Sequence, residues 1–501
     1  MNTVVKLEKE NSELREKLAK RDAQVESLKE QIRLFLHRKF SPSSEKASPD
    51  QVGLFNEAES IAEEAAFEQE ADTTIVKSHE RTRKPRISIP EELPREDIIH
   101  DLSEEDKVCP HDGAELELIG SDDLEQLDII PAQIKVIRHR RLKYACPCCE
   151  EHVKTAARST KLPIEKSIAS PGLLAYVAVQ KYCDALPLYR QSDMFKRIGI
   201  HLDRTNLANW MVKVGDLVQP FIDRLQEHLQ QQTLLHLDET TLQVLDEPGK
   251  TAQSKSYLWL MASFGDRPAL LYRYSASRSQ ETPNTLLSNQ TAAIMVDGYE
   301  GYQPACEKYN ITRIGCWAHA RRKFVEAQKV QPKGKIGKAD VAINEIKKLY
   351  AIEAATKHDP PDKRYRIRQE KAKPILENLK RWLDKSLLTI PPETAVGKAL
   401  SYLSNQWARL AAYIDDGSYP IDNNAAERSI RPFTIGRKNW LFAKSQAGAR
   451  ASANIYSLVE TAKANGLNPY NYLRYVFETL PNLNSTDMDD LLPWNIKHSD
   501  L

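Results

Sequence analysis

The sequence predicts a multidomain protein whose largest part is an α/β domain, and three observations lead to this fold class. The chain has 501 residues, enough for three or four domains rather than one ordinary core. After residue 232 the pattern changes to short apolar or alternating runs separated by turn signals, which is typical of strands. A helical stretch, roughly 319–415, then interrupts the strand-rich part. The predicted strands are 233–237, 257–263, 269–275, 292–296 and 311–315.

The composition is typical of a soluble globular protein. Hydrophobic residues make up 41% and charged residues 28%, which rules out disorder throughout. The 71 Lys and Arg nearly balance the 70 Asp and Glu, but the two signs come in separate blocks. No apolar run approaches the roughly 18 to 20 residues that span a bilayer, and the first residues are charged where a signal peptide is apolar. We therefore expect a cytoplasmic protein without a membrane segment.

Residues 1–40 are predicted to form a coiled coil. Two interleaved heptad series run from residue 4 to residue 36, mostly β-branched at the a positions and mostly Leu at d. Asn11 falls at an a position, which favours two parallel strands, whereas Arg21 at d weakens the seam. The alternative is a lone amphipathic helix packed on its own protein. We expect this segment to join two or more chains into a homodimer or a higher assembly. The next segment, 41–100, is predicted to be a linker with acidic and basic blocks.

Residues 101–155 carry a cysteine cluster that is typical of a zinc-binding segment rather than of a disulfide framework. The second half ends in a CxxC knuckle that suits tetrahedral zinc. The first half, CPHD, has an Asp where a fourth Cys would stand, so the alternative is a fold that has lost its metal. The candidate zinc ligands are Cys109, His111, Asp112, Cys146 and Cys149, with Cys148 as a further alternative.

Residues 165–230 are predicted to be helical. Within them, 189–214 is predicted to form a helix, a tight turn at Gly199 and a second helix with Asp203 as its N-cap. This pattern resembles a helix-turn-helix, whose second helix enters the major groove of DNA. An ordinary helical hairpin fits the spacing equally well. The side chains predicted to face DNA are Arg204, Asn206 and Asn209.

Two aspartates follow predicted strands directly, at Asp238 and Asp297. An Asp at the tip of a buried strand is costly unless it is solvated or coordinates a cation. Two such residues in one sheet indicate a magnesium site, because Mg²⁺ prefers hard oxygen ligands. The alternative for each Asp is an ordinary turn residue at a strand end.

A third acid, Glu427, lies in the motif PIDNNAAERSIRP (420–432). We expect Asp422 or Asn423 to cap a short helix there and Pro432 to end it. The plain alternative for Glu427 is a surface ion pair with the residue four positions later.

Several long motifs resemble the insertion sequence 66 family of bacterial transposases. They are HLDETTLQVL (236–245), VDGYEGY (296–302), CWAHARRKF (316–324), PIDNNAAERSIRP (420–432) and the segment 439–473. The resemblance extends from about residue 40 to 480. It implies an Asp-Asp-Glu transposase with a ribonuclease-H-like catalytic domain over 231–440. It also implies a helical insertion at about 325–418, and a C-terminal helical segment follows over 441–495.

The resemblance further implies that Asp238, Asp297 and Glu427 are the catalytic triad and hold Mg²⁺ or Mn²⁺. In such sites two ions about 3.5–4 Å apart assist in-line attack at phosphorus, so no covalent nucleophile is needed. Asp422 is the rival third acid. Cys316 and His319 match a Cys-x-x-His element found after the second Asp in several transposase groups, and form another candidate metal site whose alternative is a buried Cys beside a capping His. In the family, a Cys usually stands at the position of Asp112.

The predicted partner is double-stranded DNA, both as element ends and as target, and the expected place of action is the bacterial nucleoid. Lys and Arg beside a carboxylate cluster would hold phosphates. The predicted basic contacts are Arg321, Arg322, Lys323, Arg428, Arg431, Arg437 and Lys438. The resemblance also implies accessory proteins encoded by the same element. Two rival functions are a metal-dependent nuclease without strand transfer and a DNA-binding repressor with an inactive core.

Overall fold

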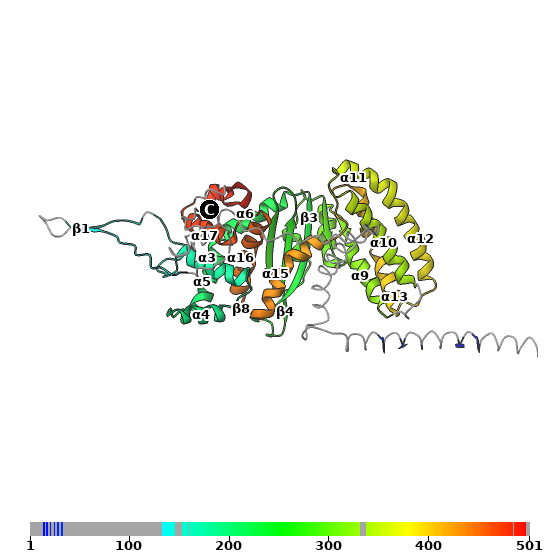
Figure 1. Cartoon of the computed structure of the whole chain (residues 1–501), viewed down its shortest axis with the longest axis horizontal. Coiled ribbons are helices and arrows are strands. Elements are labelled where there is room, and N and C mark those ends of the chain that lie inside the picture. The colour runs from blue at the N-terminus through cyan, green and yellow to red at the C-terminus, as the bar shows by residue number, and fades with distance from the viewer. Residues whose placement is uncertain are drawn as a thin grey trace, which may run out of the picture. The chain divides into compact units, whose positions relative to one another are not determined.

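The computed structural model describes residues 133–145, 153–158, 160–330, 337–483 and 485–496, together with scattered residues between 14 and 33. Contacts divide the chain into two compact units, one made of Glu64–Leu142 and the other of the rest of the chain. The elements labelled in Figure 1 belong to the larger unit. Among the residues described, no helix is both long and apolar enough to cross a membrane.

A mixed sheet forms the centre of the larger unit (Figure 1). Its main strands are β3 (Leu234–Asp246), β4 (Lys255–Ser263), β5 (Ala269–Ser275), β6 (Ala293–Val296) and β7 (Thr312–Gly315). The order across the sheet is β5-β4-β3-β6-β7, and the short strand β8 (Ala443–Ser445) pairs with β3. β4 is antiparallel to both β3 and β5, whereas β6 and β7 run parallel to β3. All five strands predicted from the sequence are present.

Asp238 lies inside β3, so the expectation that this strand ends before Asp238 is wrong. β6 is paired with β3 only as far as His236. The antiparallel partner β4 continues beyond that point and pairs with β3 up to Gln243. These hydrogen bonds keep β3 extended past the aspartate. Asp297, by contrast, follows the last residue of β6 directly, as predicted.

Helix α16 (Gln446–Ala464) closes the edge of the sheet at β5. An uncovered edge strand presents unpaired backbone groups that cost free energy when buried. Here the N–H of Leu270 donates to Thr461 Oγ1 at 3.1 Å, and the N–H of Tyr272 donates to Ser457 Oγ at 2.8 Å. Hydroxyl groups on one face of α16 therefore replace the missing neighbouring strand.

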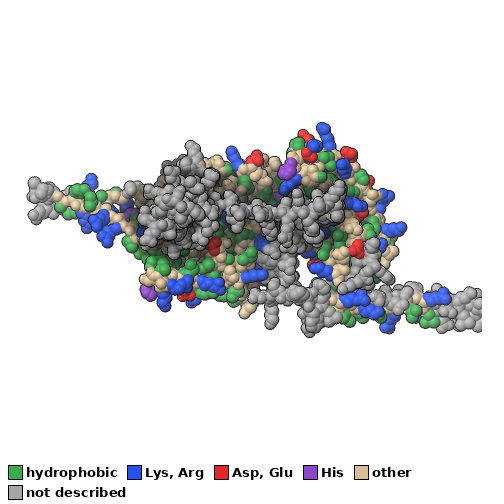
Figure 2. All heavy atoms as spheres, viewed as in Figure 1, with side chains coloured by type: hydrophobic (Ala, Val, Ile, Leu, Met, Phe, Trp, Pro, Cys, Tyr) green, Lys and Arg blue, Asp and Glu red, His purple; other side chains and the backbone are tan. Residues whose placement is uncertain are grey.

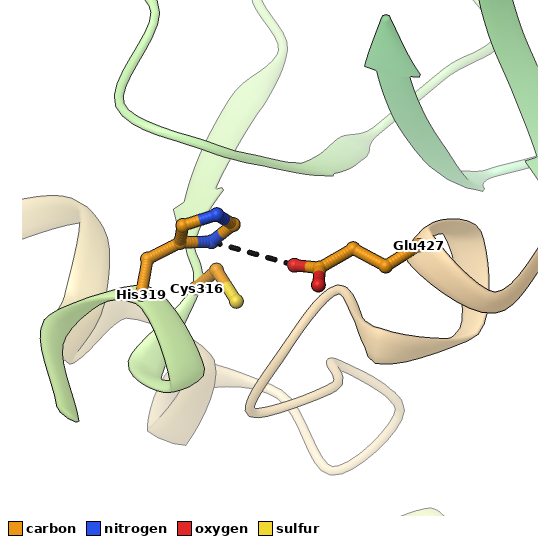
Figure 3. A group of neighbouring side chains, drawn as sticks. All are labelled: Cys316, His319 and Glu427. Atoms are coloured by element: carbon orange, nitrogen blue, oxygen red, sulfur yellow. Dashed lines mark ion pairs between the residues drawn. The ribbon is translucent and has the colours of Figure 1, made fainter. Parts of the chain in front are cut away.

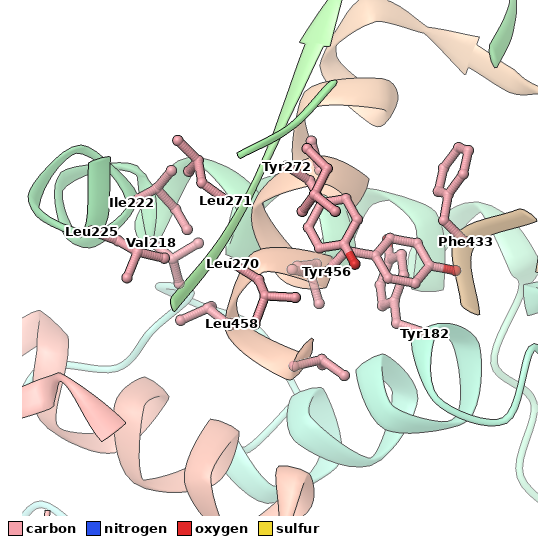
Figure 4. Packing of buried hydrophobic residues seen from close by; sticks show 14 of the residues in the cluster. Tyr182, Val218, Ile222, Leu225, Leu270, Leu271, Tyr272, Phe433, Tyr456 and Leu458 are labelled. Carbon is pink, nitrogen blue, oxygen red and sulfur yellow. The ribbon is translucent and has the colours of Figure 1, made fainter. Parts of the chain in front are cut away.

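The main hydrophobic core lies between the sheet and two sets of helices, one that precedes the sheet strands in the sequence and one that follows them. These helices include α3 (Pro171–Tyr182), α5 (Arg204–Leu217), α6 (Gln219–Gln230), α15 (Asn424–Trp440), α16 and α17 (Pro469–Thr479). Figure 4 shows aromatic and aliphatic side chains of this core. The ring of Tyr456 packs edge-on against Tyr182 at 4.9 Å and against Phe433 at 5.4 Å. Such pairs contribute about 0.5–1.5 kcal/mol beyond area burial, so they fix α15 against α3 and α16.

Helices α4 (Leu188–Arg197) and α5 form the predicted helix, turn and helix. Gly199 in the turn has φ +83°, a conformation that glycine takes at low cost. Asp203 occupies the N-cap position of α5, but its side chain makes no capping hydrogen bond. One face of α5 is buried through Leu207, Trp210 and Val214.

A helical insertion separates β7 from α15 and builds a second hydrophobic core. It contains α9 (Trp317–Gln328), α10 (Lys338–Ala355), α11 (Pro361–Ile367), α12 (Lys373–Leu387), α13 (Ala395–Asn405) and α14 (Trp407–Ala411). The fully buried guanidinium of Arg368 pairs with Glu353 and donates to the carbonyls of Tyr413, Asp416 and Tyr419. A buried charge is tolerated when its donors are partnered in this way. The insertion is thereby tied to the loop that leads into α15.

Strands β1 (Lys143–Ala145) and β2 (Val153–Thr155) form an antiparallel hairpin, and the segment that connects them contains the predicted CxxC knuckle. The candidate zinc ligands from Cys109 to Cys149 lie outside the described residues.

The coiled-coil segment is described only at scattered positions. Five apolar heptad positions in it are helical, namely Leu14, Leu18, Val25, Leu28 and Ile32. Their side chains are 47–65% exposed, so the apolar seam faces solvent in the single chain.

Candidate active site

The first two predicted acids lie at the same level of neighbouring strands. β3 and β6 are parallel, with His236 opposite Met295, and Asp238 and Asp297 each lie two residues further on. The N–H of Glu239 donates to Asp238 Oδ1 at 2.9 Å, and the N–H of Tyr299 donates to Asp297 Oδ1 at 2.8 Å. Adjacent strands are about 4.8 Å apart, so the two carboxyl groups share one small region of the sheet.

Burial raises the pKa of the Asp238 carboxyl well above its usual range, and the negative charges of Glu239, Glu427 and Asp297 raise it further. Like charges held together disfavour ionisation unless a cation compensates them. The environment of Asp238 therefore has the electrostatic character of a cation site.

Glu427 lies in the first turn of α15, and its side chain is only 5% exposed. Its Oε1 is 3.6 Å from His319 Nδ1 (Figure 3). Its Oε2 is 3.6 Å from Arg322 Nη2. Both partners come from α9, the first helix after β7. The third acid is thus a buried carboxylate at the junction of α9 and α15, which disfavours the surface ion pair considered from the sequence.

The expectation that Pro432 ends this helix is wrong, because α15 runs on to Trp440 with Pro432 inside it. An internal proline removes one backbone N–H and disturbs the preceding turn. The hydroxyl of Tyr272 donates to the carbonyl of Ser429 at 2.5 Å, which supplies a donor from outside the helix beside the disturbance. Packing of Phe433 in the core then holds the second half of α15 in place.

Asn423 connects the elements that carry the acids. Its side-chain amide donates to the carbonyl of Leu237 at 2.9 Å, and its Oδ1 lies 2.9 Å from His236 Nδ1. Its backbone N–H donates to Cys316 Sγ at 3.2 Å. Asn423 occupies the N-cap position of α15 without capping it through its side chain. One buried residue therefore joins β3, the start of α9 and the start of α15.

Asp422, the rival third acid, has structural partners. The Tyr350 hydroxyl donates to its Oδ2 at 2.9 Å, and the Asn424 backbone N–H donates to its Oδ1 at 3.1 Å. Burial raises the pKa of the Asp422 carboxyl, and these two hydrogen bonds lower it in part. Asp422 thus ties the helical insertion to the beginning of α15.

Cys316 and His319 meet Glu427, and one ligand atom from each lies within 4.8 Å of the others. Sulfur, imidazole and carboxylate are a ligand set that suits zinc. Within the described part of the chain, His319 Nδ1 and Glu427 Oε1 are buried without a hydrogen-bond partner. Burial raises the pKa of the Cys316 thiol well above its usual range, and this thiol already accepts the Asn423 N–H. The geometry accommodates either a metal ligand or a buried hydrogen-bond acceptor.

Three residues that the sequence interpretation missed complete the site. Glu239 is paired with Arg278 and accepts a hydrogen bond from the Tyr302 hydroxyl. Arg278 Nη2 also lies 4.0 Å from Asp297 Oδ2, and its guanidinium lies 3.8 Å from the ring centroid of Tyr299. Glu239 is the second acid of the motif HLDETT, so its place beside Asp238 in the sequence was a local signal that it belongs to the site. Tyr302 is the last residue of the motif VDGYEGY, whereas nothing local marks Arg278.

The predicted basic contacts differ in how far they are exposed. Arg322 lies beside Glu427 with its side chain 15% exposed, and Arg437 is buried and donates to Thr240 and Thr241 of β3. The expectation of a solvent-facing phosphate contact is wrong for Arg437, because its guanidinium is used inside the fold. Arg321 and Arg431 are half-buried. The exposed members of the predicted set are Lys323, Arg428, Lys438, Arg204, Asn206 and Asn209.

Figure 2 shows Lys and Arg side chains gathered over α4, the first helix of the helix-turn-helix-like pair. The exposed basic residues of this helix are Arg190, Lys196 and Arg197. A positive surface beside exposed polar side chains of α5 is the electrostatic footprint of a nucleic-acid-binding element.

Comparison with known protein families defines the class as a DNA transposase. The Transposase IS66 family matches residues 166–451, and the zinc-finger binding domain of transposase IS66 matches residues 106–150. The IS66 C-terminal element matches residues 457–494, and Transposase C of IS166 homeodomain matches residues 27–98. The chain belongs to the IS66 transposase family. This membership confirms the family resemblance of the sequence motifs and supports a DNA partner.

The chain is also similar to three uncharacterized proteins of Sinorhizobium fredii (strain NBRC 101917 / NGR234). It is 33% identical to y4jD over 82% of this chain and 81% of the relative. It is 32% identical to y4qI over 83% and 78%, and 30% identical to y4hP over 87% and 81%, respectively. The relatives therefore share most of their length with this chain.

Proposed function

We propose that this transposase cleaves and joins DNA strands at the ends of its insertion sequence through an Asp-Asp-Glu metal site formed by Asp238, Asp297 and Glu427. The observation that carries the proposal is the placement of two aspartates at one level of adjacent parallel strands. Glu427 is close enough to contribute to the raised pKa of Asp238. A ribonuclease-H-like fold is supported by three antiparallel strands followed by two parallel ones in the order β5-β4-β3-β6-β7.

The residues fit divalent magnesium or manganese. All three donors are carboxylates, which are the hard oxygen ligands these ions prefer. When bound, a pair of such ions supplies an activated water or 3′-hydroxyl and neutralises charge at the attacked phosphorus. In a purely structural carboxylate cluster, the burial of Asp238 and the charges of its neighbours would have to be relieved by protonation of the carboxyl group rather than by a cation.

Cations of this chain would orient the DNA at the site. Arg278 lies against Asp297, and Arg322 lies against Glu427, so each places a guanidinium beside a carboxylate that would bind metal. Guanidinium groups bind phosphate oxygens in a fixed geometry. We assign to these two residues the holding of phosphates that flank the scissile bond.

The remaining segments would serve DNA binding and assembly. The exposed face of α5 and the basic surface over α4 would contact duplex DNA, and the segment from Cys109 to Cys149 would bind zinc. The N-terminal seam would join two chains, so that two DNA ends are held together. Accessory proteins of the same element would join this assembly.

A test uses supercoiled donor DNA that carries both ends of the element, incubated with the full chain and Mg²⁺. Joined products are expected, and the Asp297→Ala variant should bind the DNA without producing them. Nicks without joining would indicate a nuclease. Binding without any strand cleavage by the unaltered chain would indicate a repressor and would overturn the proposal.

A further inference from the structure

The end of α15 carries a strained turn that the proposed chemistry does not use. Leu441 has φ +64° and ψ −49°, and the N–H of Phe442 donates to the carbonyl of Trp440 at 2.8 Å. This is a γ-turn with positive φ at its centre, a rare and strained form. For a leucine the conformation costs more than for glycine, so the surrounding structure must hold it.

Contacts on both sides hold this turn. Trp440 packs edge-on against Phe433 at 5.4 Å, and Lys181 Nζ lies 5.1 Å from the centroid of the Trp440 indole. Asn439 donates to the carbonyl of Ala185 at 2.9 Å. After the turn, β8 pairs with β3 at Ala443 and Ser445. Trp440 therefore anchors the end of α15 in the fold.

The two residues after Trp440 point their apolar side chains outward. Leu441 is 62% exposed and Phe442 is 43% exposed. Single exposed apolar residues are ordinary, but here two adjacent ones are presented by a turn that is strained and firmly anchored. Such a conformation is retained at binding sites because it fixes the position of the side chains before a ligand arrives.

The charge of the residues around this turn indicates which ligand it would bind. Between Arg428 and Arg450 the chain has six Lys or Arg and no acid. Of these, Arg428 and Lys438 are exposed on α15, and Lys444 is exposed just beyond the turn. A positive path therefore leads from Glu427 to the turn. Duplex DNA complements it, because phosphates match the cations and base steps accept an inserted apolar side chain.

We propose that Leu441 and Phe442 form an apolar wedge that unstacks a base step of the bound element end. This inference deepens the proposed function and rests on it for the identity of the DNA. Leu441 lies fourteen positions after Glu427 along α15, which is about 21 Å at 1.5 Å per residue. At about 3.4 Å per base pair, the wedge meets the duplex about six base pairs from the cleaved bond.

The experiment uses the full chain and a duplex with one element end that carries 2-aminopurine at single positions from two to ten base pairs from the cleavage point. It is done with Ca²⁺ in place of Mg²⁺, so that binding is read without cleavage. We expect fluorescence to rise severalfold at positions near six, because 2-aminopurine brightens when it is unstacked. In Leu441→Gly and Phe442→Ala this rise should be lost, and affinity for the duplex should fall about tenfold.

Controls separate the wedge from folding and from chemistry. Leu441→Gly suits the positive φ, so its melting temperature should equal or exceed that of the unaltered chain. Leu388→Ala, an 87% exposed leucine in the helical insertion, should leave fluorescence and affinity unchanged. If both wedge variants keep the fluorescence rise of the unaltered chain, the inference is overturned. It is also overturned if the variants change only the oligomeric state, because the turn would then serve contacts between proteins. A wedge signal in a chain that fails to cleave donor DNA in Mg²⁺ would refute the proposed chemistry but not the wedge.

Discussion

Asp238 and Asp297 lie side by side at one level of the sheet because β3 and β6 are parallel and in matched register. The two residues are separated by more than fifty positions in sequence and reach this level differently, one from the middle of a strand and the other from a strand end. Burial and the negative charges of its neighbours disfavour the ionised form of Asp238, so a bound cation would stabilise this arrangement. It is the feature of the fold on which the proposed metal site depends most directly.

The three acids should be required for strand cleavage and joining. Changing Asp238 to Asn, Asp297 to Asn or Glu427 to Gln should lower the rate at least about 10²–10³-fold, because each change removes charge that stabilises the transition state. Binding of the DNA end should remain within a few-fold in a gel-shift assay. Asp422→Asn is the matched control and should keep activity within tenfold. Loss of joining in Asp422→Asn, with activity retained in Glu427→Gln, would reassign the third acid.

Asn423 should be important for stability as well as for activity. Asn423→Ala leaves the carbonyl of Leu237 and a nitrogen of His236 without their buried partner, and each such loss costs about 1–3 kcal/mol. Urea unfolding measures the free energy directly. Asn405→Ala, at an exposed position, should change it by less than about 0.5 kcal/mol. An Asn423→Ala protein as stable as the unaltered chain would show that the bridge between β3 and α15 is not needed.

Acid should destabilise the fold through His236. Burial lowers the pKa of this imidazole from 6.5 to about 4, and the hydrogen bond with Asn423 offsets part of the shift. The unfolded chain therefore binds more protons than the folded chain between pH 4 and 6.5, so stability falls as pH falls through this window. The loss amounts to about 3 kcal/mol at most. Melting temperatures of the unaltered chain and His236→Gln should converge as the pH drops from 7 to 4, and a constant difference between them would contradict the prediction.

Zinc should be bound by the cysteine-rich segment. We expect at most one zinc per chain, held by Cys109, Cys146, Cys149 and either His111 or Asp112. This zinc should be weakly retained, because one thiolate is missing from a full set. Elemental analysis of the purified Cys146→Ser, Cys149→Ser double variant should find none. Zinc that survives this change would indicate the group of Cys316, His319 and Glu427, and adding Cys316→Ser should then remove it.

Residues 1–36 should control assembly and not chemistry. Their described apolar positions are helical and exposed, so a second chain would bury them. Removing the segment should weaken dimers and complexes with paired DNA ends, whereas nicking of a single end should survive at higher protein concentration. Substituting Asn11 with Ile should strengthen association and loosen the choice of oligomer. Light scattering on the isolated segment at tens of micromolar checks this, and a monomer there would refute it.

The sequence by itself determined the strands, the helical insertion, the helix-turn-helix-like pair and the family, because each depends on local periodicity or on contiguous motifs. The tertiary structure decided what depends on partners far along the chain. Pairing with β4 carries β3 past Asp238, and a hydroxyl from β5 together with core packing accommodates Pro432 inside α15. Contacts with β3 bury Arg437, and α9 brings His319 to Glu427. Local sequence patterns do not predict such long-range contacts, so these contacts become visible only in the folded chain.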